Sequence, residues 1–304
     1  MRTCNGTEVE SKAQMDPHLY HIINLTTVCL TCVANILLSI PLLVAMSRSP
    51  SLLCKSRFLF LFHLLCCDNL QLVILLAQAA LLASHFAMSV THCVVFWATN
   101  QFLGMVAVLL RATLSVDRCV AIKLPLRYDM LLTPRWQRMA VALIWAVSLL
   151  VSAVALCMVL SRVQVNAALP LCIIYMMIPC LSDIQPVAIF SMVVTAMVLP
   201  VCFITILGCF VLLCWDMQGQ LCSQRRAGVT LAMQAVQMLI YAVALVLSSS
   251  FVPAEVHSEQ LDLAINTIYI VGISLISLVY GYRSRELQSR LLKRPVCSQV
   301  STSQ

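Results

Sequence analysis

Seven long runs of apolar residues, separated by shorter polar segments, make up more than half of the chain. Each run is 20 to 28 residues long, and they cover Ile22–Met46, Phe58–Leu82, Val94–Val116, Met139–Leu160, Val187–Cys214, Gly228–Val252 and Leu263–Tyr282. Of the 19 basic and 12 acidic residues, only Asp68 and Arg111 fall inside these runs. A helix of about 20 apolar residues is long enough to cross the hydrocarbon core of a bilayer. The pattern therefore predicts an all-α integral membrane protein that folds as a seven-transmembrane helix bundle.

The stretch from Val163 to Ser182 also lacks charge and is a candidate for an eighth span. Its two prolines, Pro170 and Pro179, would each remove a helix hydrogen bond, so we expect a long apolar loop instead. Cationic residues give an independent check, because they favour the cytoplasmic side of a membrane. The segments after the first, third, fifth and seventh runs hold 15 Lys and Arg, and the opposite segments hold three. This imbalance predicts a multi-pass membrane protein with its N-terminus outside and its C-terminus inside. We expect it to reside in the plasma membrane.

The composition argues against a soluble protein. Hydrophobic residues make up 61% of the chain and charged residues 10%, whereas soluble domains carry about 25% charged residues. The net charge of +7 would suggest a nucleic-acid partner in a soluble protein. Here the basic residues flank the spans, so we expect membrane lipids and no nucleic acid as partners. There is no phosphate-binding Gly-rich loop, nucleophile motif or metal-spaced cluster, so we expect no cofactor, no metal centre and no enzyme activity.

The runs divide the chain into three regions. Residues 1–21 form an outer N-terminus, residues 22–283 the transmembrane domain, and residues 284–304 a cytoplasmic amphipathic helix and tail. Asn5-Gly6-Thr7 is a glycosylation sequon on the outer side. A second sequon, Asn24-Leu25-Thr26, lies at the membrane edge, where we expect it to be unused.

The 16 cysteines suggest a disulfide framework until they are sorted by depth. Most of them fall inside spans or on the reducing cytosolic side. Four lie on the outer, oxidising side, and four cysteines allow three pairings; they are Cys4, Cys93, Cys172 and Cys180. We expect Cys93, at the outer tip of the third span, to pair with Cys172 or Cys180 of the second outer loop, and the sequence does not choose between the two.

Asp68 and Arg111 are the two charges inside spans, and they have opposite signs. Charges in a membrane are costly, face the bundle interior and normally pair with one another. On a helical projection Arg111 shares one face with Asn100, Gly104 and Arg118. We predict that Asp68 and Arg111 form an ion pair across the second and third spans. The alternative is an Arg111 that extends to the inner surface and an Asp68 that is protonated.

The end of the third span and the residues after it resemble a known family. Asp117-Arg118-Cys119 resembles the DRY motif of class A (rhodopsin-like) G-protein-coupled receptors, and VAIKLPLRY after it resembles the form found in odorant receptors. RRAGVTLAMQAVQMLI, at the sixth span, is similar to a fish-type odorant-receptor pattern. Other landmarks of the family follow in order at Asn35, Leu64 to Asp68, Trp145, Pro200 and Tyr280. The resemblance covers nearly the whole chain.

This resemblance implies a chemosensory receptor that activates a heterotrimeric G protein of the stimulatory type. It implies that Asp117 holds Arg118 at rest and that Arg118 engages the G-protein α subunit on activation, with Tyr280 as a further coupling residue. It also implies a Na⁺ ion at Asp68 as an alternative to the ion pair.

Several positions depart from the family pattern. The NPxxY motif of the seventh span reads Ile276-Ser277-Leu278-Val279-Tyr280, so its Asn and Pro are missing. Gly208 stands where many members have Tyr, and Cys119 replaces the Tyr of DRY. Because these residues are missing, an alternative is that the chain is a receptor-like membrane protein with weak or no G-protein signalling. A small-solute membrane transporter is a second alternative.

The outer half of the bundle is where we expect the ligand, because cavities between helices are common small-molecule sites. Receptors for biogenic amines carry an Asp seven residues after the Cys of the third span, and this chain has Asn100 there. We therefore expect a small, odorant-like ligand that is neutral or mainly apolar. The candidate ligand-binding residues, chosen by depth, are Asn100, Gln101, Gly104, Met105, Ser191, Met192, Thr195, Ser248, Phe251, Asn266 and Tyr269.

Overall fold

The computed structural model describes residues 17–48, 55–84, 88–124, 126–161, 168–169, 185–216 and 263–274, together with seven residues between 232 and 243. The helices are α1 (Pro17–Ser47), α3 (Ser56–Ala83), α4 (Val90–Lys123), α5 (Tyr128–Leu131), α6 (Pro134–Leu160) and α8 (Gln185–Asp216). Two short strands, β1 (Met88–Ser89) and β2 (Ala168–Leu169), complete the labelled elements.

Five of these helices, α1, α3, α4, α6 and α8, are long and apolar enough to cross a membrane. They coincide with the first five predicted spans, and a shorter apolar helix, Leu263–Ser274, lies within the seventh. The described residues between 232 and 243, within the sixth predicted span, are helical as well. The predicted all-α membrane fold is therefore confirmed. The predicted helix over residues 284–304 lies outside the described residues.

The predicted bounds of the spans were too short. α1 begins at Pro17 and not at Ile22, and α4 continues to Lys123 although the uncharged run stops at Val116. α6 begins at Pro134, five residues before the predicted Met139. The runs ending at Val116 and beginning at Met139 had been cut at a charged residue, but a charge does not interrupt backbone hydrogen bonding. Transmembrane helices therefore continue through the interface into water.

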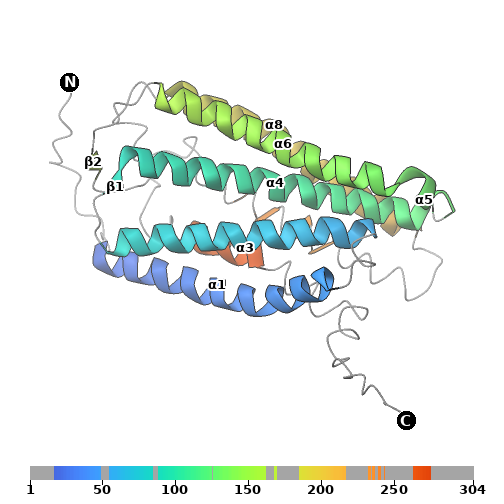
Figure 1. Cartoon of the computed structure of the whole chain (residues 1–304), viewed down its shortest axis with the longest axis horizontal. Coiled ribbons are helices and arrows are strands. Elements are labelled where there is room, and N and C mark those ends of the chain that lie inside the picture. Colours follow the sequence, from blue (N-terminus) through green and yellow to red (C-terminus); the bar gives the residue numbers. More distant parts are fainter. Residues whose placement is uncertain are drawn as a thin grey trace, which may run out of the picture.

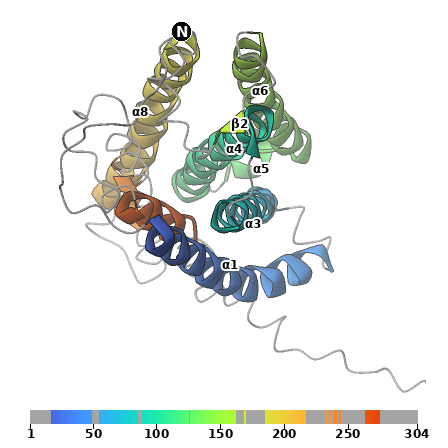
Figure 2. The ribbon, with the colours of Figure 1, turned by 90° about the vertical axis from the view of Figure 1, so that its left-hand side faces the viewer.

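α4 is the central helix of the described bundle. It packs against α3, α6 and α8, while α1 packs on the other side of α3. Figure 1 shows the long helices lying side by side, and the end view in Figure 2 shows α4 among α3, α6 and α8. The buried face of α6 carries the small residues Ser148, Ser152 and Ala155, which allow two helices to approach closely in a membrane.

The strands join the start of α4 to the segment that follows α6. Met88 pairs with Leu169 and Ser89 with Ala168, in antiparallel register. Ala168 and Leu169 belong to the stretch that was weighed as an eighth span. Because they are extended and paired with another strand, they are not part of a continuous helix, in agreement with the predicted loop.

Candidate functional site

Arg111 and Asp68 form an ion pair in the middle of the bundle. Nη2 of Arg111, on α4, donates a hydrogen bond to Oδ1 of Asp68, on α3, over 2.9 Å. Both side chains are 0% exposed, and Arg111 is among the largest fully buried side chains of the described residues. The predicted pairing is confirmed, and Arg111 does not extend to the surface.

Apolar side chains enclose this ion pair. On α4, Ala107, Leu110 and Leu114 are buried around Arg111, and on α3 Leu64 and Leu72 are buried on either side of Asp68. Such surroundings keep the local dielectric low, which strengthens the attraction within the pair and raises the cost of leaving either charge alone. The ion pair therefore connects α3 and α4 in the interior of the bundle.

Gln71 lies one helical turn from Asp68 towards the Cys93 end of the bundle. Its Nε2 donates a 2.7 Å hydrogen bond to the hydroxyl of Tyr269, on the Leu263–Ser274 helix. Gly104 of α4 faces the same two groups, since a Cβ atom there would lie 3.9 Å from both Gln71 Nε2 and Tyr269 Oη. The structure thus brings the predicted Gly104 and Tyr269 together through Gln71, which the prediction had not included.

One further turn along, two neutral amides of α4 reach the neighbouring helices. Asn100 Nδ2 donates to Gln78 Oε1 of α3 over 3.4 Å, and Gln101 Nε2 donates to Thr195 Oγ1 of α8 over 3.5 Å. These hydrogen bonds are long and therefore weak. Met105, on the same helix, is buried. The predicted α4 residues thus lie between α3, α8 and the Leu263–Ser274 helix.

Asn266 has a different surrounding from the one expected for a ligand contact. Its Nδ2 donates a 2.7 Å hydrogen bond to Oδ1 of Asn24 on α1, so it joins α1 to the Leu263–Ser274 helix. Asn24, whose sequon we expect to be unused, lies inside α1 with its side-chain oxygen engaged. Ser191, on α8, accepts the Thr195 hydroxyl through its backbone carbonyl.

Asn35 connects α1 with α3. Its Nδ2 donates to Oδ1 of Asn69 over 3.1 Å, and Ser39 Oγ donates to the same oxygen over 2.8 Å. Asn35 and Ser39 are fully buried. Asn69 Nδ2 in turn donates to the backbone oxygen of Leu65. This hydrogen-bond network connects α1 with α3. Asn35, a landmark of the family resemblance, is therefore a buried polar residue that joins two helices.

Asp117 lies at the opposite end of α4, and two hydroxyl groups converge on it. Tyr128 of α5 donates to Asp117 Oδ1 over 2.9 Å, and Ser56, the first residue of α3, donates to the same atom. Ser56 and Tyr128 also contact each other. Asp117 is only 3% exposed, whereas its neighbour Arg118 is partly buried. The carboxylate therefore joins the starts of α3 and α5 to the end of α4.

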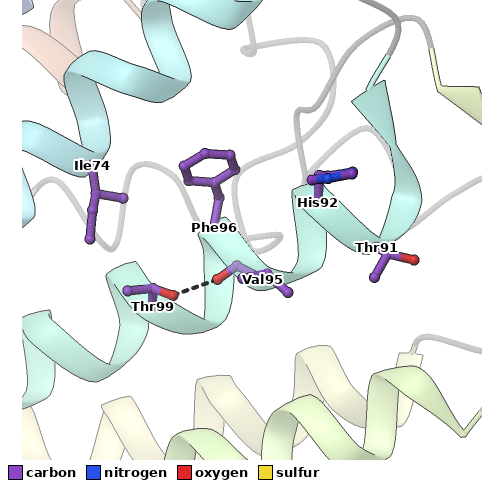
Figure 3. Close-up of a pocket in the computed structure, with 6 residues that line it drawn as sticks. All are labelled: Ile74, Thr91, His92, Val95, Phe96 and Thr99. Atoms are coloured by element: carbon purple, nitrogen blue, oxygen red, sulfur yellow. Dashed lines mark hydrogen bonds between the residues drawn. The ribbon is translucent and has the colours of Figure 1, made fainter.

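A pocket of about 350 Å³ opens between α3 and the first turns of α4. Its lining is mostly apolar and comprises Ile74, Thr91, His92, Val95, Phe96 and Thr99. In Figure 3, Thr99 turns back to its own helix, donating to the Val95 carbonyl. None of the described residues that line this pocket is a predicted ligand-binding residue.

Most of the chain matches one known protein family. Residues 40–282 match the profile described as 7 transmembrane receptor (rhodopsin family). The chain belongs to the rhodopsin family of seven-transmembrane receptors. It is thus a multi-pass membrane receptor of the G-protein-coupled class, and the family implies a G protein and a small ligand as its partners in general terms.

In this rhodopsin-family receptor most of the predicted coupling, ligand-binding and loop residues fall into three groups. Asn100, Gln101, Gly104, Met105, Thr195 and Tyr269 gather around α4 in the half of the bundle that contains Cys93. Asp117 and Arg118 lie at the other end. The third group lies outside the described residues and consists of Asn5, Cys172, Cys180, Ser248, Phe251 and Tyr280; Met192 lies on α8, and its side chain is not described.

Gln71, Gln78, Ser56 and Tyr128 are site residues that the sequence prediction had not included. A signal for two of them was present, because Asp68, Gln71 and Gln78 are three and seven residues apart and share one face of α3. Ser56 and Tyr128 gave no such signal, since a hydroxyl residue near a helix end is common. Only the tertiary fold brings them to Asp117.

Replacing Tyr128 by Phe should destabilise the receptor modestly. The substitution removes one of the two hydroxyl donors to Asp117 and keeps the ring, so we expect a loss of about 1 kcal/mol. Thermal unfolding of purified receptor in detergent measures it. Phe62→Leu, a change on α3 away from Asp117, controls for general loss of packing. An unfolding temperature equal to that of the wild type would show that the Tyr128 hydroxyl contributes nothing.

The contact between Tyr128 and Asp117 should also persist at alkaline pH. Burial raises the pKa of Tyr128 to about 12; the Asp117 carboxylate adds to the rise, and the Ser56 hydrogen bond opposes it. The pKa of Tyr128 is higher in the folded than in the unfolded protein. Its hydrogen bond therefore contributes fully to folding stability below about pH 10, and this contribution is lost as the pH rises through about 12. The phenol therefore remains a hydrogen-bond donor throughout the physiological range.

Cys93 should be essential for delivery of the receptor to the cell surface. It is buried at the start of α4 and is disulfide-bonded; Cys172 and Cys180, the predicted partners, lie outside the described residues. Removing a native disulfide typically costs about 2–5 kcal/mol, so Cys93→Ser should prevent surface delivery. Antibody labelling of an N-terminal tag on intact cells measures the surface level. Cys157→Ser, an exposed free cysteine on α6, is the matched control, and equal surface levels for both variants would contradict the prediction.

Proposed function

We propose that this receptor is chemosensory and of the odorant type. It binds a small, neutral or mainly apolar ligand in the half of the bundle that contains Cys93 and activates a heterotrimeric G protein of the stimulatory type. One observation carries the ligand class: the polar contacts that the described residues make around α4 in this half join neutral groups, Gln71 with Tyr269, Gln78 with Asn100, and Gln101 with Thr195.

The geometry of these contacts supports a neutral ligand. A charged ligand entering a low-dielectric site needs a counter-charge. On α3 and α4 no Asp, Glu, Lys or Arg occurs between the Asp68–Arg111 pair and the Cys93 end. The contacts of Asn100 and Gln101 are 3.4 and 3.5 Å long, so a ligand hydroxyl or carbonyl can replace them at small cost.

Two observations support an N-terminus outside the cell and a C-terminus inside. The disulfide bond of Cys93 is favoured by an oxidising compartment, which supports an outer position for that end of α4. The basic residues Arg57, Lys123 and Arg138 flank the opposite ends of α3, α4 and α6, as expected for a cytoplasmic face. The receptor then resides in the plasma membrane with Asp117 and Arg118 facing the cytoplasm.

The cytoplasmic end of α4 then provides the coupling residues Asp117 and Arg118, and Tyr280 of the seventh predicted span is a further coupling residue. We place Arg118 at its centre, because a guanidinium stays charged while it exchanges one acceptor for another. Asp117 accepts hydrogen bonds from Ser56 and Tyr128 and so fixes the part of α4 that carries Arg118.

The proposal is tested by cyclic AMP accumulation in cells that express the tagged receptor. The compound panel pairs neutral odorants (alcohols, aldehydes and esters) with amines and carboxylic acids of equal carbon number. We expect at least one neutral compound to raise cyclic AMP in a concentration-dependent manner, with little response to the charged analogue. Gln101→Leu should shift the response to higher concentration. Thr113→Val is the control and should not, because the Thr113 hydroxyl donates to the Leu109 carbonyl of its own helix.

Surface labelling and a parallel calcium readout make the outcomes distinct. A response to amines alone would contradict the neutral ligand class. A fall in forskolin-stimulated cyclic AMP would contradict the stimulatory G protein. Silence in every readout at normal surface level would favour the receptor-like protein without signalling.

A further inference from the structure

The family implies a sodium ion at Asp68, and the residues around this carboxylate can be compared with what such an ion needs. A hard cation binds several oxygen ligands and favours a carboxylate that carries an uncompensated charge. One feature suits a cation: Asp68 Oδ2 is buried and makes no hydrogen bond with the described residues. The other features of the site do not.

The charge of Asp68 is already compensated. The Arg111 guanidinium lies 2.9 Å from Oδ1, and both side chains are fully buried. Asp68 is the only acidic residue inside the predicted spans, so the pair has no net charge. A sodium ion on Oδ2 would place two cations on one carboxylate in an apolar interior, where their repulsion is poorly screened.

Few side-chain oxygens lie next to the pair on its own two helices. On α4, Ala107 and Gly104, one and two turns from Arg111 towards the Cys93 end, have no side-chain oxygen, and Ser115, one turn the other way, donates its hydroxyl to the Arg111 carbonyl. On α3, Cys67 donates its thiol to the Leu103 carbonyl, and Gln71 donates its Nε2 to Tyr269. Asp68 thus already has a cation as its partner, and these side chains add few of the oxygen ligands that a sodium ion needs.

We infer that Arg111 acts as a tethered cation at Asp68 and takes the place of the sodium ion, so that the stability of this receptor does not depend on Na⁺. An ion bound from solution leaves or binds as its concentration changes, whereas the guanidinium is covalently attached and always present. The inference concerns the ion pair alone and holds whatever the ligand or the G protein.

The experiment uses the purified full-length receptor in lipid nanodiscs, unfolded thermally in equimolar NaCl or KCl. For the wild type we expect equal unfolding temperatures in the two salts. Arg111→Ser removes the guanidinium and leaves both space and a hydroxyl, so Na⁺ should stabilise this variant over K⁺ by about 3 °C at ten times its dissociation constant. Adding Asp68→Asn to Arg111→Ser should abolish the difference.

Arg138→Ser, which removes an exposed charge on α6, is the matched control and should behave as the wild type. A saturable stabilisation of the wild type by Na⁺ over K⁺ would overturn the inference, and this comparison does not require any variant to fold. A folded Arg111→Ser variant without any preference for Na⁺ would also overturn it, because some other feature would then exclude the ion. Neither result depends on the odorant assay, so the two proposals fail separately.

Discussion

Asp68→Asn and Arg111→Leu should each sharply reduce the amount of folded receptor, and the double variant should recover part of the loss. Each single change leaves one buried charge without its partner in a low-dielectric interior, which typically costs about 3–5 kcal/mol. Total stabilities are commonly about 5–15 kcal/mol, so either loss is severe. Removing both charges eliminates the stranded charge and leaves side chains of suitable size.

The wild type, the two single variants and the double variant are compared by the amount of folded receptor at the cell surface and by the unfolding temperature of the purified protein. The coupling free energy is the part of the effect that is not additive. Ser148→Ala, on the buried face of α6, serves as a control that alters a buried polar group without a charge. Strictly additive losses would contradict the prediction, because they would show that the two charges do not interact energetically.

Arg118→Ala should abolish G-protein signalling while leaving folding nearly intact. Arg118 is partly buried at the end of α4, next to Asp117, so its removal strands no charge in the bilayer interior. The hydroxyls of Ser56 and Tyr128 continue to satisfy the Asp117 carboxylate. The loss should therefore appear in signalling and only slightly in stability.

Second-messenger responses normalised to surface level measure this effect. Lys123→Ala, which removes an exposed basic residue from the same end of the same helix, should keep most of the response. Signalling by Arg118→Ala at the wild-type level would disprove its assignment as the coupling residue. A parallel loss of surface receptor would show instead that Arg118 is structural.

The membrane helices could be predicted because the bilayer imposes a simple requirement. A span has to be apolar over about 20 residues, and the runs that became α1, α3, α4, α6 and α8 meet it. The helix ends could not be predicted in this way. Asp117 and Arg118 carry the charges that end the apolar run, but α4 continues through both to Lys123.

The ion pair could be predicted for a related reason. Two isolated charges of opposite sign in a bilayer have few favourable alternatives. Neutral groups give no comparable signal, because a glutamine or a serine inside a span costs less. Gln71 was therefore missed, although it bonds to Tyr269, and Asn266 was assigned to the ligand although it faces Asn24 of α1. Which helix a neutral side chain faces depends on the rotation of each helix in the bundle.

The central claim, that this rhodopsin-family chain activates a G protein through the Arg118 end of α4, is tested most directly by guanine-nucleotide exchange with purified components. Receptor in nanodiscs is mixed with a stimulatory heterotrimer and a labelled, non-hydrolysable GTP analogue, in the presence of a neutral odorant that is active in cells. We predict that the wild type and Lys123→Ala accelerate nucleotide uptake over empty nanodiscs and that Arg118→Ala does not. Uptake by the folded wild-type receptor no faster than with empty nanodiscs, for stimulatory and other heterotrimers alike, would contradict the account.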